Sequence, residues 1–300
     1  MSAATTAATV RYRVRHETAY RYAHTAEHAW QRAHLRPRSA PYQRLLQHAL
    51  TITPEPTERR SDQDFFGNPV EHFALARPHT ASSVHAESIV EVDPHGPPPD
   101  APSPGWEDVR EAAVSAGAAT RFELAQFVLS SPAVPRSGAC ARLGAAEFTP
   151  GRRWLDALSG LARRIHREFE FDPSATTVAT PLDEVLRLGR GVCQDFAHLM
   201  VAGLRSIGLP ARYVSGYLLT HPPAGQPRLV GADASHAWVS AWCPGLGWVD
   251  VDPTNGKLAD TEFVTLAWGR EYGDVAPLRG VVRGGGEHVL SVAVTVEPLE

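Results

Sequence analysis

The strongest constraint on the fold is a proline-rich segment that divides the 300-residue chain into two unlike parts. Between residues 93 and 105, six positions are proline and two are glycine. Proline has a fixed φ and no backbone N–H, so such a segment behaves as a stiff connector rather than as a helix or an interior strand. We therefore predict a β-rich domain over residues 1–93, a linker over 94–105, a second domain over 106–283 and a last strand within 284–300.

The first domain shows the two-residue periodicity that is typical of strands. Val10, Tyr12 and Val14 alternate with arginines, which predicts a strand with one buried face and one solvent face. The turn residues 67–69 separate two apolar runs and indicate a hairpin. The strands expected here cover residues 10–15, 45–53, 64–66, 70–75 and 84–92. Together they predict a β-sandwich-like N-terminal domain.

The second domain begins with helical periodicity and ends with strand periodicity. Helices are expected over residues 122–129 and 152–169 and from Cys193 to residue 207, where Gly208-Leu209-Pro210 ends the apolar stripe. Strands are expected over residues 211–219, 236–242, 248–252 and 288–296, with a loop within 222–231. Helices followed by hairpin-connected strands predict an α+β domain with an antiparallel sheet.

Composition excludes several classes of function. The net charge of −4 gives no general attraction to nucleic acid or to anionic lipid. No apolar stretch approaches the ~20 residues of a membrane-spanning helix, and no basic start precedes an apolar leader. The three cysteines are too few for a disulfide framework, and metal-binding spacings such as C-x-x-C or H-E-x-x-H are missing. We expect a cytoplasmic protein that binds neither nucleic acid nor a membrane.

Cys193 stands where a glycine-rich turn opens into an amphipathic helix. The N-terminus of a helix stabilises a thiolate through its free N–H groups and its dipole, and a thiolate is the reactive form of cysteine. A cysteine becomes an effective nucleophile when an imidazole takes its proton and later returns it to the leaving group. A single cysteine at a helix start is more often a small core residue, so Cys193 needs a histidine partner to be a candidate nucleophile.

The alternation of side chains along a predicted hairpin indicates which histidine could be that partner. His236 begins one strand and Asp252 ends the next, so both side chains lie on the same face of the hairpin. With a short turn the two residues face each other directly. With a turn that extends to Gly247, Asp252 faces Trp238 and lies diagonal to His236, at ~7–8 Å between backbones. Asp250 has the same parity and remains an alternative to Asp252.

Other residues near these motifs have less defined roles. Tyr213, Tyr217 and Trp238 are candidates for binding the substrate, with packing in the core as the alternative. His198 lies five residues along the helix from Cys193, about 140° around the axis, and is not expected to be the base. Metal binding by the cysteines and histidines has little support from their spacing.

Four sequence blocks resemble the bacterial transglutaminase-like superfamily. The blocks are Gly191-Val192-Cys193-Gln194-Asp195-Phe196-Ala197-His198, Ala211-Arg212-Tyr213-Val214-Ser215-Gly216-Tyr217, Ser235-His236-Ala237-Trp238-Val239 and Gly247-Trp248-Val249-Asp250-Val251-Asp252-Pro253-Thr254-Asn255. Leu35-Arg36-Pro37 and Asp64-Phe65-Phe66-Gly67-Asn68-Pro69-Val70 resemble the β-rich region that often precedes this core in bacteria.

The resemblance implies a papain-like fold for the core and assigns a role to each member of the triad. Cys193 would be the nucleophile, His236 the base and Asp252 the residue that orients His236. No cofactor is implied. The N–H of Cys193 would stabilise the oxyanion, and the second donor is unassigned.

This family implies an enzyme that acts on amide bonds of a protein or peptide through a thioester. Transfer to an amine and hydrolysis use the same triad, so the residues leave a transglutaminase, a cysteine peptidase and an amidase open. A non-catalytic binding module is the alternative from another class. The substrate, the oligomeric state and the role of the N-terminal domain do not follow from the sequence.

Overall fold

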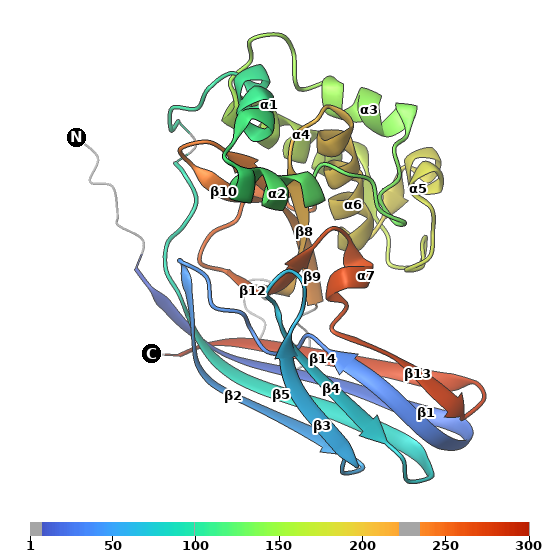
Figure 1. Ribbon diagram of the computed structural model, residues 1–300. Helices are drawn as coiled ribbons and strands as arrows, with labels where there is room; N and C mark the ends of the chain where they lie inside the picture. The colour runs from blue at the N-terminus through green and yellow to red at the C-terminus, as the bar shows by residue number, and fades with distance from the viewer. Residues whose placement is uncertain (1–7, 99, 222–234, 300) are drawn as a thin grey trace.

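The computed structural model describes residues 8–98, 100–221 and 235–299. An antiparallel sheet of long strands forms one part, and helices with a second sheet form the other (Figure 1). This arrangement confirms the predicted α+β chain with a β-rich N-terminal part. The loop predicted within residues 222–231 lies outside the described residues.

The first sheet is organised around β1 (Val10–Ala33), which is 24 residues long. The first half of β1 pairs with β5 on one side and with β14 on the other, while its second half pairs with β4 and β13. The other strands of this sheet are β2 (Gln43–Thr53), β3 (Glu58–Gln63), β4 (Pro69–Leu75), β5 (His79–Val92), β13 (Leu278–Gly284) and β14 (His288–Leu299). All of these pairings are antiparallel, as expected for strands joined by hairpins.

The sandwich-like character arises within one sheet rather than from two. The strands of both halves are connected through β1, and their apolar side chains share a small core. That core contains Ala29 and Phe73 from one half together with Ile52 and Val84 from the other. The sheet is therefore bent so that its two halves can bury apolar surface against each other.

The C-terminal strands belong to this N-terminal sheet, which differs from the predicted domain boundaries. We expected the second domain to extend to residue 283, but β13 begins at Leu278 and pairs with β1. β14 continues along the same strand, with Arg11 opposite Leu299. Without β14, the backbone N–H and C=O groups along this edge of β1 would lack partners, and the C-terminal segment supplies them. Periodicity identifies such a strand but not the sheet that receives it.

The second part packs helices against a five-stranded antiparallel sheet in the order β11-β10-β9-β8-β12. Its strands are β8 (Ala211–Leu218), β9 (Ser235–Cys243), β10 (Gly247–Asp252), β11 (Lys257–Leu258) and β12 (Phe263–Gly269). A separate pair of two-residue strands is parallel and comprises β6 (Glu170–Phe171) and β7 (Arg190–Gly191). The helices are α1 (Trp106–Ser115), α2 (Ala118–Gln126), α3 (Gly138–Ala145), α4 (Trp154–Glu168), α5 (Leu182–Leu188), α6 (Cys193–Ser206) and α7 (Tyr272–Val275).

Helix α6 is the central element of this part, and most of its side chains are buried. It contacts β8 and β9 as well as α3, α4 and α5. The approach to α3 is close because both helices place glycine at the crossing: a Cβ on Gly144 would lie 2.4 Å from the carbonyl oxygen of Gly203. The helix that begins at Cys193 is thus held from several sides.

One predicted strand is replaced by a turn. Residues 64–66 were expected to form the first strand of a hairpin, but β3 ends at Gln63 and residues 64–68 form the connection to β4. The carboxylate of Asp64 accepts hydrogen bonds from the N–H groups of Phe66 and Asn68, both at 2.8 Å. Aspartate favours such a turn by satisfying the backbone locally. The predicted hairpin is present, with its first strand displaced toward the N-terminus.

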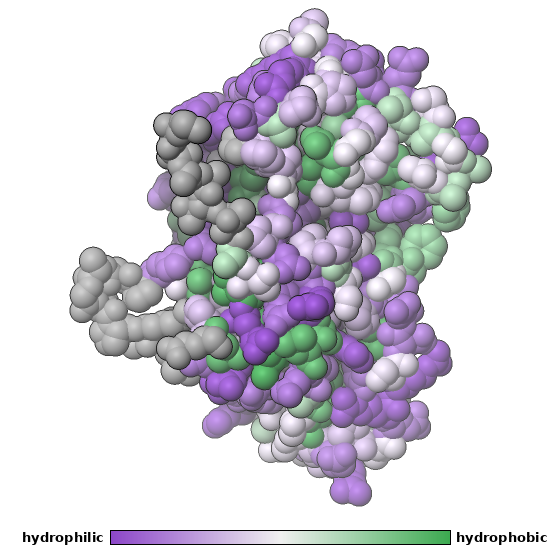
Figure 2. Space-filling model, turned by 90° about the vertical axis from the view of Figure 1, so that its left-hand side faces the viewer, coloured by the Kyte–Doolittle hydropathy of each residue, from purple (hydrophilic) through white to green (hydrophobic). Residues whose placement is uncertain are grey.

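The two parts share a continuous apolar core. Tyr12 and Val90 of the first sheet are buried together with Leu199 of α6 and Val239 of β9. Figure 2 shows that the exposed surface of one face is mainly hydrophilic, with patches of hydrophobic side chains between polar ones. Among the described residues, every helix is too short or too polar to cross a membrane.

Candidate active site

Cys193 is the first residue of α6, and a side chain in the first turn fixes its position. The carboxylate of Asp195 accepts the Val192 N–H at 2.9 Å and the hydroxyl of Thr176 at 2.6 Å. Gly191 leaves room for this carboxylate, since a Cβ at that position would lie 2.6 Å from it. The glycine-rich turn therefore allows the acidic side chain to reach back and cap the helix. The Cys193 side chain is left partly exposed at the helix N-terminus.

The hairpin of β9 and β10 brings His236 and Asp252 together. Cys243 pairs with Gly247 and Val239 pairs with Val251, which is the register of the longer of the two predicted turns. In this register Asp252 lies diagonal to His236, and the side chains close the distance. Their hydrogen bond joins Nε2 of His236 to Oδ2 of Asp252 at 2.7 Å.

Asp252 is held by a local network at the end of β10. Its Oδ1 accepts the Thr254 N–H at 2.8 Å, and its Oδ2 accepts the side-chain amide of Asn255 at 2.6 Å. The side chain is fully buried, so these donors replace the water that a carboxylate would otherwise bind. The turn after Pro253 thus orients the carboxylate toward His236.

The electrostatics of the pair favour opposite charges on the two side chains. Burial by itself would lower the pKa of His236, but hydrogen bonds to Asp252 and Cys193, with their negative charges, raise the pKa to about 10. Burial would likewise raise the pKa of Asp252, but the hydrogen bond from His236 and those from residues 254 and 255 lower it. His236 is therefore an imidazolium at neutral pH, neutralised by a buried carboxylate.

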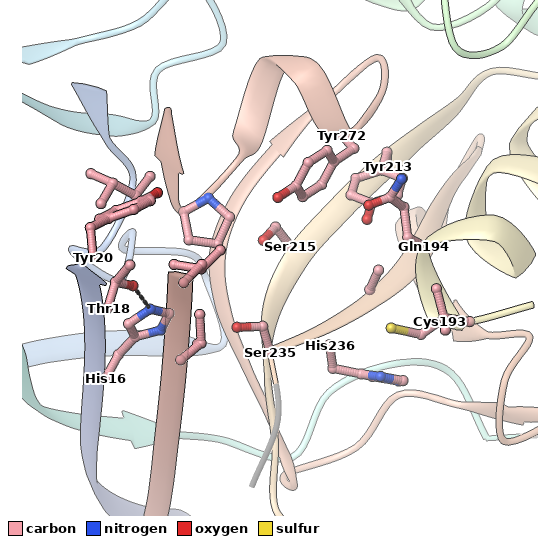
Figure 3. Close-up of a pocket in the computed structure, with 16 residues that line it drawn as sticks. His16, Thr18, Tyr20, Cys193, Gln194, Tyr213, Ser215, Ser235, His236 and Tyr272 are labelled. Carbon is pink, nitrogen blue, oxygen red and sulfur yellow. Dashed lines mark hydrogen bonds between the residues drawn. The ribbon is translucent and has the colours of Figure 1, made fainter. Parts of the chain in front are cut away.

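Cys193 and His236 line the same pocket and lie next to each other in it (Figure 3). Because Nε2 of His236 is bonded to Asp252, the ring nitrogen that remains for the thiol is Nδ1. A sulfur, an imidazole and a carboxylate from α6, β9 and β10 therefore converge, although 59 residues separate Cys193 from Asp252 in the chain. Such an arrangement can supply a nucleophile, a base and an orienting group.

Asp250, the alternative to Asp252, has other partners. Its Oδ2 accepts hydrogen bonds from the hydroxyl of Tyr42 at 3.1 Å and from the indole N–H of Trp238 at 3.3 Å. Asp250 is buried on the same face of the hairpin, but it lies farther than Asp252 from the end of the hairpin that carries His236. The structure thus favours Asp252 as the partner of His236.

Of the three aromatic residues predicted to bind substrate, only Tyr213 lines the pocket. Tyr217 and Trp238 are fully buried behind it, and for them the prediction is corrected. The Tyr217 hydroxyl forms a hydrogen bond of 3.0 Å with Nδ1 of His16. The Trp238 side chain packs edge-on against Phe263 and donates to Asp250. Both side chains join buried layers of the fold and do not face the nucleophile.

His198, the histidine predicted not to be the base, has a structural role. Burial, together with the charge of Arg205, lowers its pKa to about 3, so the ring is neutral. Its Nε2 accepts the N–H of Tyr272 at 3.1 Å and thereby connects α6 to the start of α7. The other cysteines, Cys140 and Cys243, are buried. Within the described residues, His, Cys, Asp and Glu side chains form no group of three suited to a metal ion.

The pocket has a second wall that the sequence did not indicate. It has a volume of about 250 Å³ and lies between α6, β8 and β9 on one side and β1 and β14 on the other. His16, Thr18 and Tyr20 of β1 face Cys193 across it (Figure 3). The alternation in β1 places these residues on the same face as Val14, but only the packing of the two parts shows that this face reaches the nucleophile.

Comparison with known proteins gives matches over both parts of the chain. The model of the bacterial transglutaminase-like N-terminal region matches residues 12–91, and the model of the transglutaminase-like superfamily matches residues 146–253. An uncharacterized protein of Mycobacterium tuberculosis is 40% identical over 304 residues, which cover 98% of this chain and 95% of that protein. An uncharacterized protein of Mycobacterium leprae is 34% identical over 275 residues, which cover 90% of this chain and 92% of that protein.

Two further relatives carry functional descriptions. A protein-glutamine gamma-glutamyltransferase of Pseudomonas aeruginosa is 38% identical over 102 residues, which are 31% of this chain and 15% of that protein. Among solved structures, a candidate cysteine protease from Cytophaga hutchinsonii superposes with a TM-score of 0.78 at 18% identity, covering 98% of this chain and 92% of that one. This structural match confirms the predicted fold.

Proposed function

Since this chain belongs to the bacterial transglutaminase-like superfamily, as its four sequence blocks indicated, we propose that it is a cysteine-dependent acyl-transfer enzyme. Its substrates are amide groups of proteins or peptides, and Cys193, His236 and Asp252 form its catalytic triad. The observation that carries the proposal is the buried hydrogen bond between His236 and Asp252 in the same pocket as Cys193.

In the first half of the reaction, the Cys193 sulfur attacks the amide carbonyl carbon. The C–N bond breaks, a thioester forms, and Nδ1 of His236 gives its proton to the departing amine or ammonia. The N–H of Cys193 at the start of α6 stabilises the oxyanion of the tetrahedral intermediate. Asp252 keeps the ring of His236 in position and stabilises its charge throughout.

In the second half, a nucleophile attacks the thioester while His236 accepts its proton. Water releases a carboxylic acid, and an amine forms a new amide; in both cases the C–S bond breaks and the sulfur of Cys193 keeps the electron pair of that bond. Transfer is supported by the local similarity to a glutamyltransferase, and hydrolysis by the fold shared with a candidate cysteine protease. The proposal covers the common first half-reaction and leaves the acceptor to experiment.

The proposal also places the enzyme in the cytoplasm. All three cysteines are free thiols, including the partly exposed Cys193, and cytoplasmic reductants keep such thiols reduced. A nucleophilic thiol benefits from this environment because oxidation would inactivate it.

Mass spectrometry of a peptide library tests the proposed reaction. The purified protein is incubated with the library in the presence and absence of a small primary amine, and a Cys193→Ala variant serves as the matched control. We expect amide exchange, deamidation or cleavage with the wild type, and none with the variant. Products that the variant forms at the same rate, or an unchanged library with the wild type, would contradict the proposal.

A further inference from the structure

The first sheet, which contains β1, β13 and β14, contributes the wall of the pocket that lies opposite the nucleophile. Tyr20 comes from β1, Leu278 from β13, and Leu290 and Val292 from β14. In Figure 3, Tyr20 lies at the end of the pocket farthest from Cys193. A substrate held by Cys193 would therefore extend onto a surface built by the N-terminal and C-terminal ends of the chain.

The described lining of the pocket is rich in apolar groups and carries little charge. None of its residues is Asp, Glu, Lys or Arg. His16 is neutral at pH 7, because burial, together with His85, lowers its pKa to about 4. The charge of His236 is already paired with that of Asp252, so a charged side chain that enters the far end of this space would lose water without gaining a counter-ion, which is costly. The far wall thus favours an uncharged side chain.

The apolar residues of this wall are accessible rather than packed. The residues Leu290 and Val292 are 51% and 50% exposed, on a strand that pairs only with β1 among the described residues. Farther along the same face of β14, Val294 and Val296 are buried in the main core. The neighbouring Val289 is directed to the opposite face, where it lines a different hollow. One face of β14 therefore runs from the core to the active-site pocket and ends there in exposed apolar side chains.

The size of the pocket limits what can enter it. Its volume of about 250 Å³ is below the ~300–1,000 Å³ of pockets that enclose a drug-sized ligand. The space suits the reacting amide and one large side chain, while the rest of a peptide would lie outside. Beside the pocket, residues 288–293 of β14 pair with β1 along one edge, and no described strand covers their other edge, so an extended peptide can pair there.

We propose that the sheet of β1 and β14 forms a specificity subsite for an extended peptide. The subsite accepts a large uncharged side chain, aromatic or branched aliphatic, next to the reacting amide, and Tyr20, Leu290 and Val292 contact it. This inference rests on the proposed function, since it takes Cys193 as the attacking group. It assigns to the N-terminal region a direct part in substrate selection.

Peptidyl chloromethyl ketones test the subsite without requiring turnover, because Cys193 displaces the chloride and becomes alkylated. Two reagents are compared that differ only in the side chain next to the ketone, phenylalanine in one and lysine in the other. The ratio of their inactivation rates is measured for the wild type, Leu290→Glu and Val289→Glu. The two variants add the same charge to the same strand, but only position 290 faces the pocket. Alkylation by iodoacetamide, which has no side chain to recognise, reports on Cys193 itself.

We expect the wild type and Val289→Glu to prefer the phenylalanine reagent by about tenfold or more, which is the effect of a modest apolar contact. Leu290→Glu should shift the ratio at least tenfold toward the lysine reagent. Equal rates with both reagents in the wild type, or equal shifts in the two variants, would overturn the subsite. If iodoacetamide and both ketones leave Cys193 unmodified, the proposed function itself is refuted. Normal iodoacetamide labelling without side-chain preference refutes only the subsite.

Discussion

Replacement of Asp252 by asparagine isolates the charge at the centre of the site. The variant keeps nearly the same shape but removes the negative charge next to His236. In the wild type, hydrogen bonds to Asp252 and Cys193 outweigh burial and raise the pKa of His236 from 6.5 to about 10. Because each unit of pKa corresponds to about 1.4 kcal/mol, this difference amounts to about 5 kcal/mol in favour of the imidazolium.

In Asp252→Asn, burial continues to lower the pKa of His236, while the charge of Asp252 is gone and only the smaller contribution of Cys193 still raises it. The ring is then largely neutral at pH 7, and the thiol loses its cationic partner. If the loss of the cationic ring raises the activation free energy of alkylation by only about 1.4 kcal/mol, alkylation slows tenfold. Turnover should fall further, by about 10²–10⁴, because proton transfer by His236 is also impaired.

The assay is the rate of Cys193 alkylation by iodoacetamide between pH 5 and pH 10. We expect the wild type to react at pH 6, where the raised pKa of His236 keeps a cationic ring beside the Cys193 sulfur. The Asp252→Asn profile should move to higher pH. Superimposable profiles for the two proteins would refute the role assigned to the charge of Asp252.

The same pair determines how stability depends on pH. His236 has a raised pKa, so its stabilising contribution is complete below pH 6.5 and is lost as the pH rises through about 10. Asp252 has a lowered pKa, so its contribution is present above about pH 4 and is lost as the pH falls through its folded pKa. The difference in unfolding free energy between wild type and Asp252→Asn should therefore be largest near pH 5–6.5 and shrink toward pH 10, as urea titrations at several pH values can check.

Two further variants test the packing that supports the site. Tyr217→Phe leaves Nδ1 of the buried His16 without its hydroxyl partner and should cost about 1–3 kcal/mol of stability, measured as a lower urea midpoint, whereas an unchanged midpoint would contradict this. Gly144→Ala places a Cβ 2.4 Å from the carbonyl oxygen of Gly203 and should cost about 3 kcal/mol, since two backbones must separate. A fully stable Gly144→Ala protein would mean that α3 and α6 do not approach so closely.

The local features of the site could be predicted because they depend on short-range rules. A period of two residues places His236 and Asp252 on one face of a hairpin in either register, and the structure shows their hydrogen bond. A glycine-rich turn followed by an amphipathic run located the start of α6 at Cys193. These inferences needed only the geometry of one strand pair and one helix end.

Features that depend on long-range packing could not be predicted in this way. Alternation identified β14 as a strand, but its pairing with β1 joins segments about 280 residues apart. Tyr217 and Trp238 belong to apolar strands, and only the packing of the layers decides that Tyr213 reaches the pocket while the others do not. The contribution of Tyr20 to the active-site pocket likewise follows from how the two parts dock.

The thioester at Cys193 is the central claim, and its direct detection is the most decisive measurement. The protein is mixed with an activated ester of an N-acylated phenylalanine, quenched in acid and weighed by mass spectrometry. We predict an added acyl group that peptide mapping places on Cys193, that hydroxylamine removes, and that His236→Ala accumulates far more slowly. Release of product with no acyl group on the protein, or an acyl group that remains in Cys193→Ala, would contradict the account.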